Sequence, residues 1–256
     1  MSDISKIRDY WEDKTPQHWY SKQSPGTKEY YDEIQEYRYT RAYPYLPELA
    51  DFAAQNGKTV LEVGCGQGTD LYQYAKSGAD VTGIDLTEGA ISKSRDLFGA
   101  YGAEARLETS NAETLAQFPD NAFDVVYSFG VIHHTPNTNH CFESIYRVLK
   151  PGGKAYIMIY AKGLNYLIKF SLFHVLKGGF LRGSFQDTIN NNTEYQRNSP
   201  LTKMYSKKEA RRMAHQFHNV EIKKLHNPSF SYLLPPFIDR PLGAILGDNL
   251  FIRGTK

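Results

Sequence analysis

Short apolar runs alternate with amphipathic stretches through most of this chain. Strand-like runs lie near residues 58–63, 80–85, 104–109, 123–128 and 154–160. Stretches with helical spacing near 69–78 and 88–100 are the crossovers that parallel strands require. The pattern predicts an α/β fold with a mostly parallel sheet, because strands that alternate with helices pair in parallel.

The two ends of the chain depart from this alternation. Residues 1–56 mix aromatic and charged residues at roughly helical spacing, which predicts a helical N-terminal cap before a domain over residues 57–256. After the fifth strand, residues 161–204 form a long insertion. Its first part, 164–181, is apolar, and its asparagine-rich second part has little reason to be ordered in isolation.

Strand and helix signals return in the last quarter of the chain. Ser206, with Glu209 three residues later, predicts a capped helix start. Residues 220–225 and 249–253 predict two further strands, the last of them antiparallel. A second apolar insertion, 230–238, lies between these two strands.

A glycine turn follows the first strand and is the most informative local sequence. The apolar run 60–63 contains the acidic Glu62 and leads into a G-x-G-x-G turn at 64–68. Glycines let the backbone turn tightly and approach a ligand where a Cβ would collide. The second strand ends in Asp85, a carboxylate placed to accept hydrogen bonds from both hydroxyls of a ribose. This spacing fits dinucleotides and S-adenosylmethionine, and Thr69 disfavours the dinucleotide pattern G-x-G-x-x-G.

Three further blocks follow the glycine turn in order. They are Asn111-Ala112-Glu113 after the third strand, Phe123 to His134 along the fourth strand and its exit, and Arg147 to Gly153 before the fifth. In this order and spacing the chain resembles the class I S-adenosylmethionine-dependent methyltransferases, closely over residues 58–160 and more loosely in the C-terminal strands. The resemblance implies a Rossmann-like, seven-stranded sheet of order 3-2-1-4-5-7-6 whose last strand is antiparallel, with S-adenosylmethionine as cofactor.

The resemblance places the cofactor across the carboxyl ends of strands 1, 2 and 4. Glu62 would attract the ammonium of its methionine part, or would instead cap amides of its own loop. Asp85 would bind the ribose, and Leu86 would pack on the adenine. The implied cofactor residues are Glu62, Gly64, Cys65, Gly66, Gly68, Asp85, Leu86, Asn111, Ala112, Glu113, Ser128 and Phe129.

Two of these positions leave alternatives open. Asn111 stands where the family more often has Asp; it keeps an acceptor oxygen for the adenine amino group, but it could instead make a turn after the strand. Ser128 and Phe129 lie at the exit of the fourth strand, where backbone carbonyls in this family face the methionine ammonium. Phe129 could also border the sulfonium, because an aromatic face attracts positive charge.

His133 and His134 are the candidate catalytic residues. They follow the fourth strand, which points at the methyl group in this fold, and histidine titrates near neutral pH. An oxygen or nitrogen acceptor usually needs a base to take its proton, so His134 is our first candidate for that base and His133 the second. One of the pair could instead hydrogen-bond the loop beside Thr135-Pro136. We expect no metal.

The net charge, the apolar stretches and the cysteines indicate which kinds of partner and which cellular setting fit this chain. The net charge of +2 gives no broad basic surface for nucleic acid, and no stretch reaches the roughly 18 uninterrupted apolar residues of a transmembrane helix. Cys65 and Cys141 do not make a disulfide framework and fit a reducing, cytoplasmic setting. The apolar insertions leave a peripheral membrane contact or a homodimer open.

These features favour a methyltransferase that moves a methyl group to an oxygen or nitrogen of a small organic molecule by in-line displacement. The insertion 161–204 would then be a lid over the substrate. Methylation of RNA or protein is a second hypothesis, although the fourth strand exits through Ser128-Phe129-Gly130-Val131 rather than the N-P-P-Y-like motif of base-amino methyltransferases. A non-catalytic cofactor-binding subunit is a third, and the intact glycines with Asp85 speak against it.

Overall fold

The computed structural model describes residues 3–14, 17–163, 171, 175, 184–192, 198–225 and 247–256. The apolar insertion at 164–181 lies outside the described residues except for Ser171 and Val175, and the one at 230–238 lies wholly outside them. The expected roles of these two segments as a lid, a dimer interface or a membrane contact therefore stay predictions.

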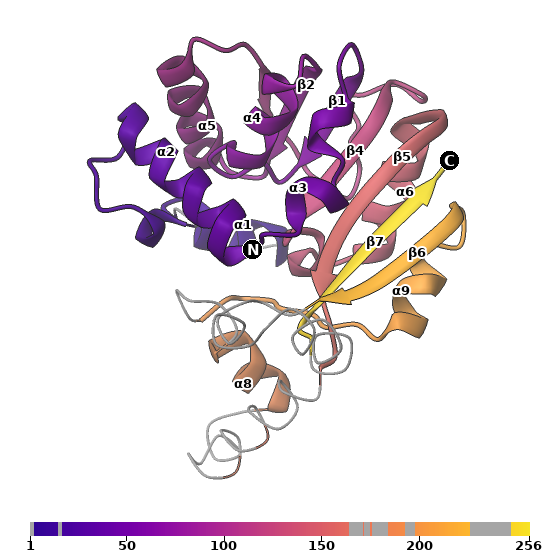
Figure 1. Cartoon of the computed structure of the whole chain (residues 1–256). Coiled ribbons are helices and arrows are strands. Elements are labelled where there is room, and N and C mark those ends of the chain that lie inside the picture. Colours follow the sequence, from indigo (N-terminus) through magenta and orange to yellow (C-terminus); the bar gives the residue numbers. More distant parts are fainter. Residues whose placement is uncertain are drawn as a thin grey trace.

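Among the described residues, seven strands form one mixed sheet (Figure 1). In chain order they are β1 (Thr59–Val63), β2 (Asp80–Asp85), β3 (Arg106–Thr109), β4 (Phe123–Phe129), β5 (Leu149–Tyr160), β6 (His218–Leu225) and β7 (Asn249–Thr255). The spatial order is β3-β2-β1-β4-β5-β7-β6; the first five strands pair in parallel, and β7 is antiparallel to both its neighbours. The predicted strand order and antiparallel last strand are confirmed.

Helices cover both faces of this sheet (Figure 1). The layer on one face contains α4 (Thr69–Lys76) and α5 (Glu88–Tyr101), and the layer on the other contains α6 (Thr138–Val148) and α9 (Lys207–Met213). A hydrophobic core lies on each face of the sheet, and successive residues of a strand point into opposite cores. Val60 packs with α4 and α5, whereas Leu61 packs with α6 and α9. Burial on both faces of the sheet explains why the central strands β1 and β4 are nearly continuous apolar runs.

Local sequence sets several helix ends. Thr87 caps α5 by accepting the amide of Ala90, and Gly102 ends that helix in the left-handed conformation with a φ of 61°. Ser206 and Glu209 form the predicted capping box at the start of α9, each side chain accepting from the other residue's backbone amide.

The strand β5 starts earlier than the predicted strand at 154–160. It begins at Leu149, which pairs with Phe123 of β4, and an irregularity in register follows this pair. The amide of Gly152 donates to the carbonyl of Lys256 at 2.9 Å. These bonds join residues far apart in the chain, so the local Pro-Gly-Gly sequence gives no sign of them.

The N-terminal cap is helical and shares a hydrophobic core with the sheet. It contains α1 (Asp3–Trp11), η1 (His18–Tyr20), α2 (Lys28–Tyr37), the π-helical turn η2 (Arg38–Ala42), α3 (Leu46–Leu49) and η3 (Phe52–Ala54). Tyr30, Tyr31 and Ile34 of α2 are buried in the core formed with α4 and α5.

The asparagine-rich part of the insertion forms helix α8 (Phe185–Asn192), beyond the end of the sheet where β5 stops and β7 starts (Figure 1). Asn190 Oδ1 accepts the amide of Thr202 at 2.9 Å, and Gln186 Nε2 donates to the carbonyl of Thr202 at 2.7 Å. Contacts with the chain near Thr202, rather than the local sequence, therefore hold this segment in place.

Candidate active site

The glycine turn leaves β1 in a conformation that only glycine adopts readily. Gly64, Gly66 and Gly68 have φ angles of 78°, 57° and 82°. A Cβ at Gly64 would lie 2.4 Å from both Cγ atoms of Val131. The turn and the exit of β4 are therefore in direct contact, and a side chain at Gly64 would push them apart.

Asp85 ends β2 and ties the glycine turn to that strand. Its Oδ2 accepts the Gly66 amide at 3.1 Å, and its Oδ1 accepts the amide and hydroxyl of Thr87 at 3.1 and 3.0 Å. Burial raises the pKa of the Asp85 carboxyl, and these hydrogen bonds oppose that rise. A carboxylate has about four lone-pair directions, so Oδ2 can accept a further donor such as a ribose hydroxyl. Cys65 is buried beside it, with its Sγ 3.6 Å from the Ser94 hydroxyl.

Glu62 has a buried oxygen with no hydrogen-bond partner. The residue is 3% exposed, and its Oε2 is unpaired in the described structure. Burial, followed by the nearby charge of Asp70, raises the pKa of this carboxyl well above its usual value, while a hydrogen bond from the Leu71 backbone lowers it. Glu62 thus meets a backbone amide of α4, rather than one of the glycine turn, and still has an oxygen that fits the ammonium group of a bound amino-acid moiety.

A buried ion pair joins the cap to the helix that follows the glycine turn. Arg38 of η2 donates from Nε and Nη2 to the two carboxylate oxygens of Asp70, at 2.7 and 2.5 Å. The hydroxyls of Tyr39 and Tyr127 also donate to Asp70, at 2.6 and 2.7 Å. Burial opposes ionisation of Asp70, but Arg38 and the two hydroxyls hold its pKa below the ordinary value. Sequence reasoning missed this pairing, because nothing in the local pattern near Arg38 points to α4.

The exit of β4 is closely packed. Ser128 is buried, and its hydroxyl donates to the carbonyl of Val63 at 3.0 Å. Phe129 packs edge-on against Tyr43 with ring centroids 4.9 Å apart, and the Arg38 guanidinium lies 5.0 Å from the centre of the Phe129 ring. Arg38 is thus a cation beside Phe129 in this structure. The possibility that the ring also borders the cofactor's sulfonium stays a prediction.

The segment after β3 forms its own turn. Asn111 Oδ1 accepts the Glu113 amide at 2.9 Å, which is the turn considered as the alternative to an adenine contact. Glu113 Oε1 accepts the amide of Asn137 at 2.5 Å, so this carboxylate supports the start of α6. Leu86 and Ala112 are partly buried, and Ala112 packs against the core on the α6 side. The side chain of Asn111, expected to contact adenine, and that of Glu113, a second expected cofactor residue, therefore already have partners within the protein.

The 3-10 helix η4 (Ile132–His134) carries the two candidate catalytic histidines directly after Val131. His134 Nδ1 lies 2.7 Å from the carbonyl oxygen of Leu201, so Nδ1 carries the proton and donates it. The His134 ring packs edge-on against Trp11 of α1, with centroids 5.4 Å apart. His133 is fully buried, neither ring nitrogen has a partner in the described structure, and burial lowers its pKa well below the usual value.

The start of the chain contacts both sides of the glycine turn. We refer to residues 3–14 and Gln17 as the N-terminal strap. At one end of it Trp11 meets His134, as described above. Three hydrogen bonds connect the strap to α5 and to the glycine turn. In α5, the Gly89 amide donates to Glu12 Oε1 at 2.8 Å and Lys93 Nζ donates to the Lys14 carbonyl at 2.9 Å. In the glycine turn, Gln67 Nε2 donates to Gln17 Oε1 at 3.3 Å.

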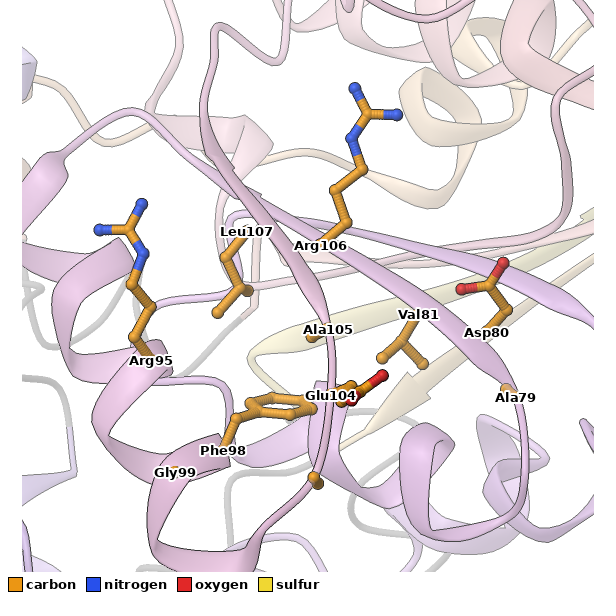
Figure 2. Close-up of a pocket in the computed structure, with 11 residues that line it drawn as sticks. Ala79, Asp80, Val81, Arg95, Phe98, Gly99, Glu104, Ala105, Arg106 and Leu107 are labelled. Atoms are coloured by element: carbon orange, nitrogen blue, oxygen red, sulfur yellow. The ribbon is translucent and has the colours of Figure 1, made fainter.

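An open groove of about 670 Å³ lies elsewhere on the molecule (Figure 2). It is lined by the start of β2, the C-terminal half of α5 and the chain leading into β3, so it is at the opposite end of β2 from the glycine turn. Phe98 lies in the groove, while Arg95 and Arg106 extend away from it (Figure 2). These arginines pair with Glu88 and Glu108. The groove is therefore separate from the loops described above.

The sequence blocks at this site match a known protein family. The family model described as "Methyltransferase domain" matches residues 61–157, which include the glycine turn, Asp85 and η4. Phosphoethanolamine N-methyltransferase 2 of Caenorhabditis elegans is 38% identical over 120 residues. Residues 61–157 of this chain are therefore similar to the methyltransferase family.

The relatives differ in the atom that their names say is methylated. The match to the C. elegans N-methyltransferase covers 46% of this chain and 27% of that protein. Cycloartenol-C-24-methyltransferase of Arabidopsis thaliana is 38% identical over 38% of this chain and 30% of that protein. Ubiquinone biosynthesis O-methyltransferase of Pseudomonas entomophila is 35% identical over 39% of this chain and 43% of that protein. The matched segment spans less than half of each relative, and it does not decide the methylated atom.

Solved structures share the fold over more of the chain. The PH0226 protein from Pyrococcus horikoshii OT3 aligns with a TM-score of 0.59 at 20% identity, covering 96% of this chain and 98% of that one. A phosphoethanolamine N-methyltransferase 2 from Haemonchus contortus, in complex with phosphomonomethylethanolamine and S-adenosylhomocysteine, aligns with a TM-score of 0.54 at 18% identity. That alignment covers 79% of this chain and 49% of the other. At these identities the likeness establishes the fold.

Proposed function

We propose that this methyltransferase moves a methyl group from S-adenosylmethionine to an oxygen or nitrogen of a small organic molecule. One observation carries the proposal: Val131 packs on Gly64, which brings the histidines of η4 beside the loop that would hold the cofactor. A base next to the methyl donor serves an acceptor that must lose a proton. Relatives named for methylation of phosphoethanolamine and of a ubiquinone precursor support the same class of reaction.

The residues in place at the glycine turn fit the cofactor of this family. S-adenosylmethionine, when bound, supplies an electrophilic methyl group on a sulfonium. The unpaired Oε2 of Glu62 would take the ammonium, the turn 64–68 would wrap the methionine part, and Asp85 would accept from the ribose. Much of the acceleration can then come from holding the acceptor in line with the methyl group.

His134 is the general base in this proposal. Its Nδ1–H donates to the carbonyl of Leu201 at 2.7 Å, so the lone pair of the neutral ring is on Nε2. That nitrogen would take the proton from a hydroxyl or ammonium acceptor. His133 is the second candidate, because both its ring nitrogens are without partners in the described structure.

We also propose that the insertion acts as a lid on the active site. Its last residues contact both histidines: the amide of Lys203 donates to the carbonyl of His133 at 3.1 Å, and Leu201 accepts from His134. A movement of this segment would therefore move the base, and closure would exclude water from the reaction.

The proposed division of the chain is a cap at 1–56 and a methyltransferase domain at 57–256, with the lid at 161–204.

A small molecule is the proposed partner. No group of three metal-ligating side chains and no helix able to cross a membrane occurs in the described part of the chain. The net charge of +2 supports a small acceptor over RNA.

Cys65 and Cys141 are free and buried, which supports a reducing, cytoplasmic location. A homodimer or a peripheral membrane contact is the alternative role for the apolar insertions.

A methyl-transfer assay tests the proposed function. The full chain is incubated with radiolabelled S-adenosylmethionine and, separately, with a small-molecule extract, an RNA fraction and a protein fraction. We expect label in the small-molecule fraction, and we expect calorimetry to show S-adenosylhomocysteine binding. Label in RNA or protein alone would replace the small-molecule proposal. Binding without transfer to any fraction would indicate a non-catalytic cofactor-binding subunit.

A further inference from the structure

Three buried side chains near the end of β5 carry polar atoms that have no hydrogen-bond partner in the described structure. The atoms are both ring nitrogens of His133, the amide nitrogen of Asn249 and the hydroxyl oxygen of Thr202. These residues are 0%, 3% and 0% exposed, in that order. Buried polar groups in folded proteins nearly always have partners, so three unpaired groups together call for an explanation.

Tyr160, the last residue of β5, is a neighbour of His133 and Asn249, and a backbone hydrogen bond next to Thr202 brings Thr202 near His133. The Tyr160 ring lies against the ring of His133, with centroids 3.9 Å apart. Tyr160 is the register partner of Asn249 in the antiparallel pair of β5 and β7, and the side chains of such partners are neighbours on one face of the sheet. Thr202 adjoins Lys203, whose amide donates to the carbonyl of His133. We call His133, Tyr160, Thr202 and Asn249 the acceptor cluster.

The acceptor cluster extends from the exit of β4, beside the glycine turn, to Thr202 in the last part of the proposed lid. His133 is two residues after Val131, which packs on the glycine turn at Gly64. Thr202 holds α8 through its backbone amide and carbonyl, and α8 lies beyond the end of β5 (Figure 1). The proposed function puts the acceptor in this region, so the unpaired atoms are in a position to meet it.

The chemistry of the acceptor cluster suits an uncharged group. An amide, a hydroxyl and a neutral imidazole offer donors and acceptors without a net charge, and burial lowers the pKa of His133 well below its usual value. An ion placed on these groups would lose its hydration and gain no counter-charge from them. Tyr160, and Trp11 against His134, add aromatic surface that favours a ring-containing ligand.

We propose that the acceptor cluster binds a hydroxyl group of the methyl acceptor, and that this acceptor is an uncharged, ring-containing molecule rather than a phosphorylated or ammonium compound. The inference rests on the proposed function. An oxygen–methyl bond forms as the sulfur–methyl bond breaks, and the hydroxyl proton passes to His134. Asn249 then determines specificity, and it lies outside the segment 61–157 that the family model matches.

The charge of the methylated product tests the substrate class. The full chain is incubated with radiolabelled S-adenosylmethionine and a small-molecule extract, and the labelled product is separated on cation- and anion-exchange columns at pH 7. A product that neither column retains supports the inference. A retained product, with turnover intact, overturns the inference and leaves the proposed function standing. Cofactor binding with no labelled product would contradict the proposed function itself.

Substitution of Asn249 tests the specificity role. We expect Asn249→Leu to lower the rate at limiting extract by about 10-fold or more, because a hydrogen bond to the acceptor is lost. The rate at saturating extract and the affinity for S-adenosylhomocysteine should stay near those of the unmodified protein. Thr202→Val, which removes the hydroxyl and keeps the side-chain shape, should act in the same direction and serves if Asn249→Leu does not fold.

Gln55→Leu is the matched control for these variants. Gln55 is also fully buried with an unpaired oxygen, Oε1, but it precedes β1 at the other end of the strand from the glycine turn. The control should leave the rate at limiting extract unchanged. If Asn249→Leu and Thr202→Val keep the unmodified rate at limiting extract, the unpaired atoms have no part in acceptor binding and the inference is overturned.

Discussion

Glu62 is the residue whose protonation a bound cofactor would change most. Without a ligand, burial raises the pKa of its carboxyl well above the usual value of 4.5. The folded state then holds this proton more tightly than the unfolded chain does. The contribution of Glu62 to stability is therefore present below pH 4.5 and is lost as the pH rises through the raised pKa. An ammonium group beside Oε2 would favour the ionised carboxylate and lower that pKa.

Binding of S-adenosylhomocysteine should therefore release a proton from Glu62. We expect affinity to increase with pH between 4.5 and the raised pKa of the carboxyl. Calorimetry in buffers of different ionisation enthalpy measures the protons released. Glu62→Gln should bind with no such release, and equal release from both proteins would show that the proton comes from another group.

His134 is the residue on which we propose that the chemical step depends. We expect His134→Ala to lower the single-turnover rate by about 100-fold or more, the usual effect of losing a general base. Affinity for S-adenosylhomocysteine should be unchanged, because the imidazole serves the acceptor. His140→Ala, at an exposed position of α6, is the control. An unchanged single-turnover rate in His134→Ala would leave the histidine with a structural role at Leu201.

Among the elements, the N-terminal strap is the one that we expect to influence cofactor exchange. It is bonded to the Gly89 amide and to Gln67 of the glycine turn, and α1 reaches η4 through Trp11. A ligand at the carboxyl end of β1 would lie between the hydrogen bonds from the strap to Gly89 and Gln67 and the contact of Trp11 with His134. Release of the cofactor therefore requires some of these contacts to open.

Glu12→Ala should speed the dissociation of S-adenosylhomocysteine. The loss of the bond to the Gly89 amide is expected to raise the dissociation rate by about 2- to 10-fold, which corresponds to one net hydrogen bond. Stopped-flow displacement by unlabelled cofactor measures this rate. Asp9→Ala changes an exposed acid of α1 and should have no effect. Equal rates in both variants would mean that the strap does not restrict exchange.

At the scale of the whole molecule, the cap and the sheet form a single structural unit. They share the core that contains Tyr30 and Ile34, and the buried pair of Arg38 and Asp70 crosses between them. Removing one member of a buried ion pair leaves the other charge unpaired, which costs more than removing both. The pair therefore couples the folding of the cap to that of the glycine turn.

Arg38→Met should destabilise the whole protein by about 3–5 kcal/mol, since it leaves the Asp70 carboxylate buried without its counter-charge. The double variant Arg38→Met, Asp70→Leu should recover part of this loss. Urea denaturation followed by fluorescence and by circular dichroism measures both, and a single transition is expected. Arg8→Met, at an exposed position of α1, is the control. Separate transitions for cap and sheet would contradict the single unit.

Much of the architecture follows from short-range sequence signals. The apolar runs predict β1 to β4, Ser206 with Glu209 predicts the start of α9, and the glycines predict the turn after β1. The order of the strands came from the family resemblance. The start of β5 at Leu149 was missed, because its bonds to Phe123 and to the last residue of the chain are invisible in the local pattern. The spacing of apolar residues and the choice of turn residues reflect interactions between residues a few positions apart. Sequence alone predicts structure well over that range.

The sequence by itself determined the α/β sheet, the glycine turn with Glu62 and Asp85, and the resemblance to a methyltransferase family. Tertiary structure alone decided which groups are already paired: Arg38 with Asp70, 32 residues apart, and His134 with Leu201, 67 residues apart. It also decided which buried atoms have no partner, Asn249 among them. The physical reason is that pairing and burial depend on where the packed elements place each side chain, and no local pattern of residues encodes that placement.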